Sequence, residues 1–206
     1  MKIKTLTDMT HWSHVALAEV LRPGDLAVDL TVGSGQDTAF LAEAVGPGGC
    51  VAGFDIQVKA LESAAAMLAG KGIEVTLHKE RGEPGIPASG VHLYLADHAR
   101  WTDLVDGSPK AIIANLGYLP GSDQNLVTGA ATTVTALSDA LKRLPVGGRL
   151  AVVSYVHHPG GREEAVAVKE LLTRETEGEF RVLCIDNHLD QEGPFLMVAE
   201  RRKKTI

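Results

Sequence analysis

The chain has 206 residues, of which 45% are hydrophobic and 22% charged, and this size and composition are typical of one globular domain. Its net charge of −6 argues against a protein that binds nucleic acid through a general basic surface. The two distant cysteines, Cys50 and Cys184, exclude a disulfide framework and a zinc ribbon, and no apolar run reaches the length of a membrane span. With no recognisable export signal, we expect a cytoplasmic protein with neither a metal site nor a membrane partner.

Short apolar segments alternate with amphipathic segments, which predicts an α/β fold with a mostly parallel sheet and helices on both faces. In chain order, helices are expected near residues 11–22, 37–45, 58–68, 101–105, 127–144 and 163–174. Strands are expected at residues 26–30, 51–55, 75–78, 91–95, 111–114, 150–155, 181–185 and 195–199. The last two strands have no helix-length segment between them, so they should pair antiparallel. Glycines and prolines in residues 73–90 predict a loop or small insertion within a single domain covering residues 1–206.

A turn of small residues, Asp29-Leu-Thr-Val-Gly-Ser-Gly-Gln-Asp-Thr38, follows the first of these strands. Gly33 and Gly35 stand where the strand passes into a helix, so a ligand can approach the backbone closely at a helix N-terminus. Asp55 ends the next strand, where a carboxylate can accept hydrogen bonds from ribose hydroxyls. The pattern predicts a nucleoside site, and Thr38 in the place of the third glycine of a dinucleotide loop disfavours a nicotinamide cofactor.

A second motif, Asn115-Leu-Gly-Tyr-Leu-Pro-Gly121, follows the strand at residues 111–114. The carboxyl edge of an open α/β sheet is where ligands bind. At that edge the Asn115 carboxamide oxygen can hold an amine N–H so that the nitrogen lone pair points at a methyl group, and Tyr118 can stack on a base. Asn, Gly and Pro are also ordinary turn residues, but the position after a buried strand favours a functional site.

These two segments resemble the motifs of class I S-adenosylmethionine-dependent methyltransferases, with Thr31 in place of the first of three alternating glycines. Asn115-x-x-Tyr118 is similar to the Asn-Pro-Pro-Tyr motif of members that methylate amino groups. The resemblance implies a Rossmann-like fold with a seven-stranded sheet, an antiparallel last strand and S-adenosyl-L-methionine as cofactor. It also implies cofactor contacts from Asp29, Thr31, Gly33, Gly35, Asp37, Thr38, Asp55, Gln57, Asp97, His98 and Asn115.

Further segments make the chain resemble a small bacterial family first described as rRNA-methylase-like: Phe54-Asp-Ile-Gln57, Val156-His-His-Pro-Gly160 and Pro194-Phe195. Characterised members methylate the amine of 5-aminomethyl-(2-thio)uridine at the tRNA wobble position. This resemblance implies the tRNA anticodon stem-loop as substrate, Asn115 and Tyr118 as catalytic residues, and substrate contacts from Tyr118, Leu119, His157 and His158. The chain departs from the family pattern at Ser34, at Gln36 and at the pair Asn187-His188. These departures concern the detailed contacts with the substrate more than the cofactor site.

Three other functions remain alternatives at this point: amino methylation of an rRNA base, a nicotinamide-dependent oxidoreductase, and a nucleotide- or RNA-binding module without turnover. An alkylamine is mostly protonated at neutral pH, so the enzyme must bind its neutral form or remove a proton. The sequence identifies no proton acceptor. It also leaves the oligomeric state open, with a homodimer as one alternative.

Overall fold

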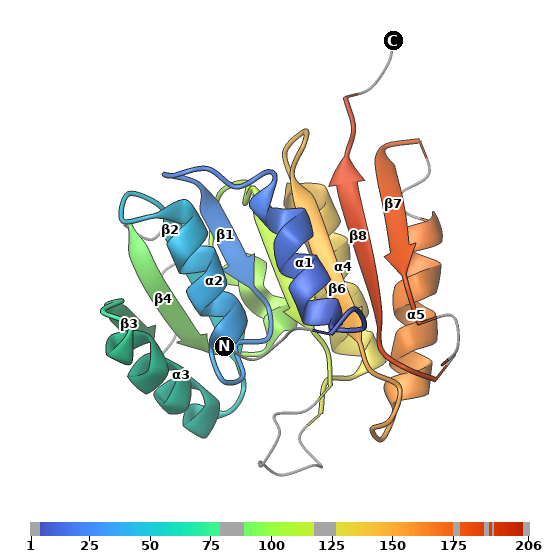
Figure 1. The fold of residues 1–206 in the computed structure, drawn as a ribbon, viewed down its shortest axis with the longest axis horizontal. Coiled ribbons are helices and arrows are strands. Elements are labelled where there is room, and N and C mark those ends of the chain that lie inside the picture. The colour runs from blue at the N-terminus through green and yellow to red at the C-terminus, as the bar shows by residue number, and fades with distance from the viewer. Residues whose placement is uncertain are drawn as a thin grey trace.

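The computed structural model of the chain describes residues 5–78, 89–117, 127–174, 178–187, 190 and 192–203 (Figure 1). Its helices are α1 (Met9–Ala18), α2 (Gln36–Val45), α3 (Val58–Gly70), the short 3-10 helix η1 (His98–Asp103), α4 (Ala130–Arg143) and α5 (Gly161–Arg174). Its strands are β1 (Leu26–Asp29), β2 (Cys50–Asp55), β3 (Val75–His78), β4 (Gly90–Leu95), β5 (Ala111–Asn115), β6 (Arg149–Ser154), β7 (Phe180–Ile185) and β8 (Phe195–Arg201).

The described strands form one sheet in the order β3-β4-β2-β1-β5-β6-β8-β7. Only β8 runs against its neighbours, pairing antiparallel with both β6 and β7. The predicted α/β class and antiparallel last strand are therefore confirmed. The sheet has the eight strands predicted from the apolar segments, whereas the family resemblance implied seven. The additional strand is β3, which pairs in parallel with β4 and extends that edge.

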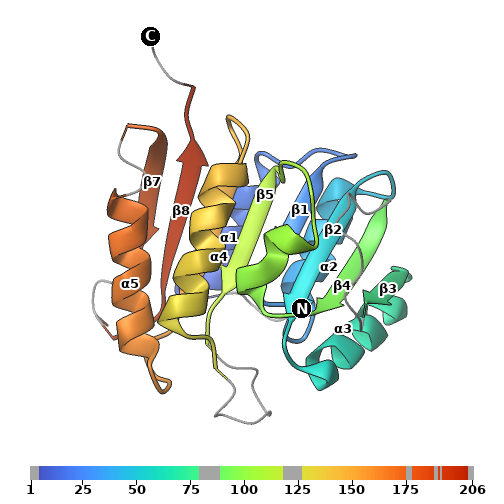
Figure 2. The ribbon, with the colours of Figure 1, turned by 180° about the vertical axis from the view of Figure 1, so that it is seen from behind.

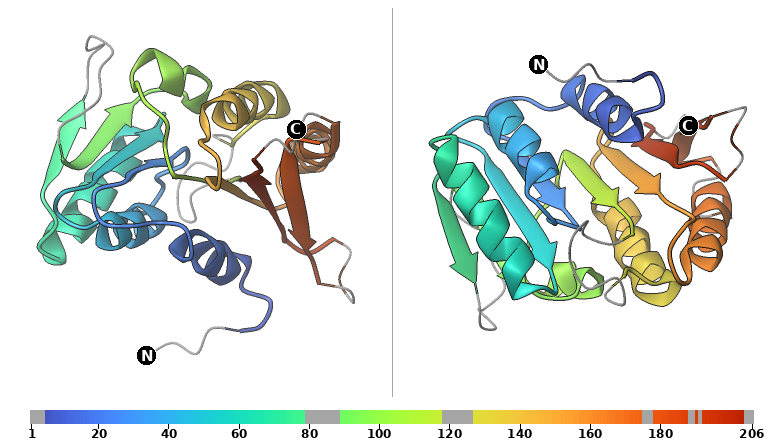
Figure 3. Two further views of the ribbon diagram at one scale, coloured as in Figure 1. Left: turned by 90° about the horizontal axis from the view of Figure 1, so that it is seen from above. Right: turned by 60° about the horizontal axis from the view of Figure 1, so that its bottom comes forward.

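Helices cover both faces of the sheet. On the side seen in Figure 1 lie α1, α2 and α3, whereas α4, α5 and η1 lie on the side seen in Figure 2. The view from above in Figure 3 shows the sheet between these two layers. The carboxyl ends of the parallel strands therefore meet along one edge, at the bottom of Figure 1, where helices on both faces can add side chains.

Alternation along each strand divides the core into two apolar clusters. Ile112 faces the cluster beneath α4 and α5, which includes the fully buried Trp101. Its neighbour Ile113 faces the cluster beneath α1, α2 and α3, which includes Leu17. Successive side chains of a strand point to opposite faces, so a strand covered on both sides is apolar throughout. The near-continuous apolar segments in the sequence are the signature of this arrangement.

Helix boundaries differ from the predictions where side chains cap the backbone. Asp8 accepts a hydrogen bond from the His11 amide at 3.0 Å, so α1 begins at Met9, ahead of the predicted residue 11. Asp97 accepts from the Ala99 amide at 2.8 Å and starts η1 three residues ahead of the predicted helix at 101–105. Asp97 follows β4, at the carboxyl edge of the sheet.

The predicted loop or insertion at residues 73–90 is partly ordered as sheet. Val75–His78 forms β3 and Gly90 begins β4, while residues 79–88 lie outside the described residues. Among the described helices, none combines the length and the apolar character that a membrane span requires.

Close packing at Gly53 in β2 generates a prediction about stability. A Cβ atom at this position would lie 2.6 Å from Val32 Cγ2 and 2.7 Å from Leu93 Cδ2. We expect Gly53→Ala to lower the free energy of unfolding by about 1–3 kcal/mol, because the neighbouring side chains must shift. Urea denaturation measures this change, and Gly48→Ala, whose added Cβ meets no atom within 4 Å, is the control. Equal loss of stability in the two variants would contradict the prediction.

Candidate functional site

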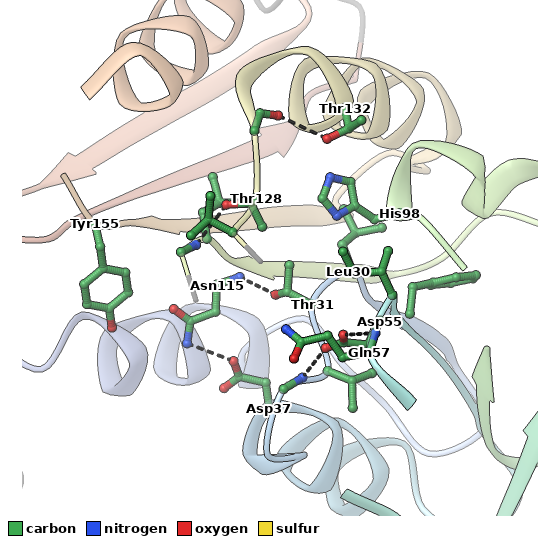
Figure 4. Close-up of a pocket in the computed structure, with 18 of the residues that line it drawn as sticks. Leu30, Thr31, Asp37, Asp55, Gln57, His98, Asn115, Thr128, Thr132 and Tyr155 are labelled. Atoms are coloured by element: carbon green, nitrogen blue, oxygen red, sulfur yellow. Dashed lines mark hydrogen bonds between the residues drawn. The ribbon is translucent and has the colours of Figure 1, made fainter. Parts of the chain in front are cut away.

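A pocket of about 730 Å³ lies at the edge of the sheet where β1, β2, β4, β5 and β6 end (Figure 4). It is bordered by the loops after these strands, by the N-terminus of α2 and by Thr10 of α1. The described residues that line it are Thr10, Leu30, Thr31, Val32, Gly33, Ser34, Gln36, Asp37, Phe54, Asp55, Ile56, Gln57, Ala96, Asp97, His98, Asn115, Leu116, Gly117, Val127, Thr128, Gly129, Thr132, Tyr155, His157 and His158.

A fully buried carboxylate, Asp29, holds the loop after β1. It accepts hydrogen bonds from the Thr38 hydroxyl at 2.6 Å and from the Thr31 amide at 3.0 Å. The pKa of Asp29 is raised to about 7, mainly by burial and then by the charge of Asp37, against the lowering effect of its two hydrogen bonds. Asp29 and Thr38 therefore support the pocket wall from behind.

The loop passes into α2 through Gly35, which adopts the left-handed conformation with φ of 83°. A Cβ atom on Gly35 would also lie 2.8 Å from the Cβ atom of Ala64 in α3, so only glycine fits without a shift. Gly33, Ser34 and Gln36 line the pocket around this turn. The first turn of α2 thus borders the cavity, and a helix N-terminus favours a negatively charged or hydrogen-bond-accepting group.

Asp55, at the end of β2, ties its strand to the same loop. Its carboxylate accepts from the Gly33 amide at 3.0 Å and from the Gln57 amide at 2.9 Å. Burial raises the pKa of Asp55, and the hydrogen bonds from Gln57 and Gly33 lower it. Each carboxylate oxygen can accept more than one hydrogen bond, so Asp55 keeps capacity for ligand hydroxyls.

His98, after β4, has a buried ring nitrogen, Nε2, with no hydrogen-bond partner among the described residues. Burial lowers the pKa of His98, although the charges of Asp97, Glu164 and Asp55 act in the opposite direction. Buried polar atoms are normally paired, so an unpaired one that lines a pocket indicates a place for a polar ligand atom. Asp97 also lines the pocket, with one carboxylate oxygen engaged in capping η1.

Asn115 ends β5 at the centre of the pocket edge (Figure 4). Its amide N–H donates to the Thr31 hydroxyl at 2.7 Å, which joins the ends of β5 and β1. Its side-chain nitrogen donates to the Asp37 carboxylate at 3.2 Å and to the Thr10 hydroxyl at 3.3 Å. The threonine in the place of the usual first glycine therefore has a structural role that a glycine cannot supply.

Buried polar groups also hold the chain beyond Asn115. Glu164 of α5 is 1% exposed and accepts hydrogen bonds from the hydroxyls of Thr133, at 2.5 Å, and Thr128, at 2.7 Å. The Thr128 hydroxyl in turn accepts from the Gly117 amide at 2.9 Å. This network joins Gly117 after β5 to Thr128 before α4. Residues 118–126 lie outside the described residues.

The pocket brings together most of the residues that the sequence analysis predicted. Among those, the ones lining it are Thr31, Gly33, Asp37, Asp55, Gln57, Asp97, His98, Asn115, His157 and His158. Asp29, Gly35 and Thr38 lie behind the wall instead. His157 is exposed, whereas the His158 side chain is buried with Nε2 3.6 Å from the Glu164 carboxylate. Tyr118 and Leu119 lie outside the described residues.

Sequence reasoning missed several site residues, among them Thr10, Tyr155, Thr128 and Glu164. Tyr155 follows β6 and lines the same edge. His157 was predicted because it follows a buried strand, and the same criterion could have selected Tyr155. Thr10 and Glu164 belong to helices, and no local pattern marks a helical residue that contacts the pocket or its supporting network. No group of His, Cys, Asp and Glu side chains in the described parts of the chain could hold a metal ion.

Comparison with known proteins places the chain among methyltransferases. Residues 51–200 match the rRNA methylase family model. A curated relative, the chloroplastic tRNA (mnm5s2U34)-methyltransferase of Arabidopsis thaliana, is 34% identical over 167 residues, which are 78% of this chain. The chain spans 57% of the length of that relative.

Two solved structures share the whole fold. The rRNA methylase of Clostridium thermocellum is 33% identical with a TM-score of 0.84, over 96% of this chain and 100% of that one. A methyltransferase of Streptococcus mutans in complex with SAH is 31% identical with a TM-score of 0.78, over 97% and 99%. These matches confirm the predicted family resemblance and fold class.

The raised pKa of Asp29 generates a prediction about pH. In the unfolded chain an aspartate titrates near pH 3.9, so between about pH 4 and pH 7 the folded protein binds a proton that the unfolded chain has released. The free energy of unfolding should therefore fall as pH rises through this range. Asp29→Asn removes the titration, so over this range its stability relative to the parent should rise by on the order of 3 kcal/mol. Urea denaturation at each pH measures the difference, and a difference independent of pH would contradict the assignment.

Proposed function

The chain belongs to the rRNA methylase family of S-adenosylmethionine-dependent methyltransferases, and we propose that it methylates an amine on tRNA. The proposed substrate is 5-aminomethyl-(2-thio)uridine at the wobble position of the anticodon stem-loop, and the product is its methylaminomethyl form. The observation that carries this proposal is the Asn115 carboxamide, held at the centre of the pocket edge by Asp37 and Thr10. The name of the Arabidopsis relative supports the same nucleoside.

The residues on the α2 side of the pocket fit the cofactor. Asp55 would accept hydrogen bonds from the ribose hydroxyls, and the unpaired His98 Nε2 would pair with a polar atom of the adenine. The N-terminus of α2, which borders the pocket, would face the amino-acid part of the cofactor. When bound, S-adenosylmethionine supplies the methyl group: the amine nitrogen bonds to the methyl carbon, the bond from carbon to sulfur breaks, and its electron pair stays on sulfur.

The other side of the pocket would receive the nucleoside. Thr10, Tyr155 and His157 line this side, and the aromatic rings offer stacking surfaces to a base. The Asn115 carboxamide oxygen would accept from the substrate amine and so direct the nitrogen lone pair. We retain Tyr118 and Leu119 as proposed substrate contacts on the strength of the resemblance in sequence.

The surface charge bears on how tRNA would bind. A chain with a net charge of −6 offers few phosphate contacts, so recognition would depend on the modified base and the shape of the anticodon loop. Methylation of rRNA is the second candidate, because the family model carries that name. We also propose one domain over residues 1–206 and a cytoplasmic setting.

The role of Asp55 is testable by cofactor binding. We expect Asp55→Asn to weaken binding of S-adenosylmethionine by roughly 10-fold, because the amide loses one acceptor and the negative charge that strengthens ribose hydrogen bonds. Isothermal titration with the purified variant measures this affinity. Asp103→Asn, at an exposed carboxylate outside the pocket, is the matched control. Unchanged affinity in Asp55→Asn would remove it from the cofactor site.

The substrate is testable by mass spectrometry of nucleosides. Undermodified tRNA carrying the aminomethyl base should gain a single methyl group after incubation with the enzyme and cofactor. Asn115→Ala should slow single-turnover transfer by roughly 10²-fold while cofactor affinity stays within several-fold, because only orientation of the amine is lost. Methyl transfer to rRNA and not to this tRNA would favour the second candidate, and a full rate in Asn115→Ala would exclude the proposed role of the carboxamide.

A further inference from the structure

A carboxylate lies directly behind the Asn115 side chain. Asp37, in the first turn of α2, is 5% exposed. One of its oxygens lies 2.6 Å from His14 Nε2, and the other accepts from Asn115 Nδ2 at 3.2 Å. His14, Asp37 and Asn115 therefore form a continuous chain of hydrogen bonds that runs from α1 through α2 to the end of β5.

The chemistry of this chain determines which way the carboxamide faces. An ionised carboxylate only accepts hydrogen bonds, so the nitrogen of Asn115 has to face Asp37, and Nε2 of His14 has to carry a proton. The Thr10 hydroxyl is the second acceptor of the Asn115 nitrogen. The amide oxygen is then turned away from Asp37, as Figure 4 shows, and Asn115 lines the pocket. The reverse orientation would bring two oxygens together and leave Asp37 without this donor.

The carboxylate is itself held in place. The His14 ring stacks on Phe40 of α2 with a centroid distance of 4.1 Å and an interplanar angle of 7°. The pair of His14 and Asp37 thus joins α1 to α2, and a carboxylate in the first turn of a helix is favoured by the helix dipole. A hydrogen bond to an ionised acceptor also polarises the amide, which makes its oxygen a stronger acceptor.

We propose that Asp37, anchored by His14, is the positioning residue that keeps the Asn115 carboxamide oxygen toward the substrate amine. The inference rests on the proposed function only in naming an amine as the group that the oxygen receives. Both acceptor oxygens of Asp37 are already engaged within the protein.

Kinetic variants test the positioning role. Asp37→Ala should lower the single-turnover rate at saturating cofactor by roughly 10-fold or more, with the dissociation constant of S-adenosylhomocysteine unchanged within a few-fold. Asp37→Asn should recover much of the rate, because its amide oxygen can still accept from Asn115 and its nitrogen can donate to the other tautomer of His14. Asp103→Asn controls for loss of a carboxylate elsewhere. A large loss of S-adenosylhomocysteine affinity in Asp37→Ala, or equal rates for Asp37→Ala and Asp37→Asn, would overturn the proposal.

A double-mutant cycle in protein stability tests the contact between Asp37 and Asn115 without a measurement of activity. Asn115→Asp places two carboxylates face to face and should lower the midpoint of urea denaturation at pH 7. The swapped double variant, Asp37→Asn with Asn115→Asp, restores one donor and one acceptor and should regain most of that loss. Additive effects would show that the two side chains do not act as a pair and would overturn the proposal. If the parent enzyme methylates no amine, the proposed function fails, and the cycle still decides whether Asp37 holds Asn115.

Discussion

Burial of the Asp29 carboxylate is the constraint on which the pocket depends. An isolated buried charge is unfavourable, and here hydrogen bonds from the Thr31 amide and the Thr38 hydroxyl offset part of that cost. Those two bonds set the path of the loop after β1. Once the loop is set, the Thr31 hydroxyl receives the Asn115 amide and the Gly33 amide reaches Asp55, so the ends of β1, β2 and β5 are joined.

The two sides of the pocket are held by different means. On the α2 side, backbone amides and strand-end carboxylates form the wall, and main-chain geometry there allows little adjustment. On the side of β5, the Thr10 side chain from α1 and the Asp37 side chain from α2 hold Asn115. Glu164 of α5 holds Thr128. Methyl transfer requires two molecules to meet in line, so the relative position of these two sides matters more than the strength of either alone.

The fold was predictable because continuous apolar segments are typical of strands that are covered on both faces. In Ile112-Ile113, successive side chains point to opposite faces of the sheet and enter the two core clusters. The polar residues at the edge of the sheet were predictable because each stands at or just after the end of a buried strand. These residues are Asp55, His98 and Asn115. Helical residues that line the pocket or hold its lining, such as Thr10 and Glu164, were not predictable, because their position depends on how helices pack against the sheet. For Asp37 the sequence indicated the correct region, but its bonds to His14 and Asn115 appear only in three dimensions.

The placement of β8 has a consequence for the order in which the protein assembles during synthesis. β8 lies between β6 and β7, yet it is made after both of them. Until it emerges from the ribosome, β6 presents an unpaired edge and β7 has no partner in the sheet. The β4-β2-β1-β5-β6 section can pair first, and Tyr155 and His157 are attached to its last strand. The nascent chain can therefore form most of the pocket wall before β8 is made. During that time the unpaired edge of β6 is exposed to non-native strand pairing.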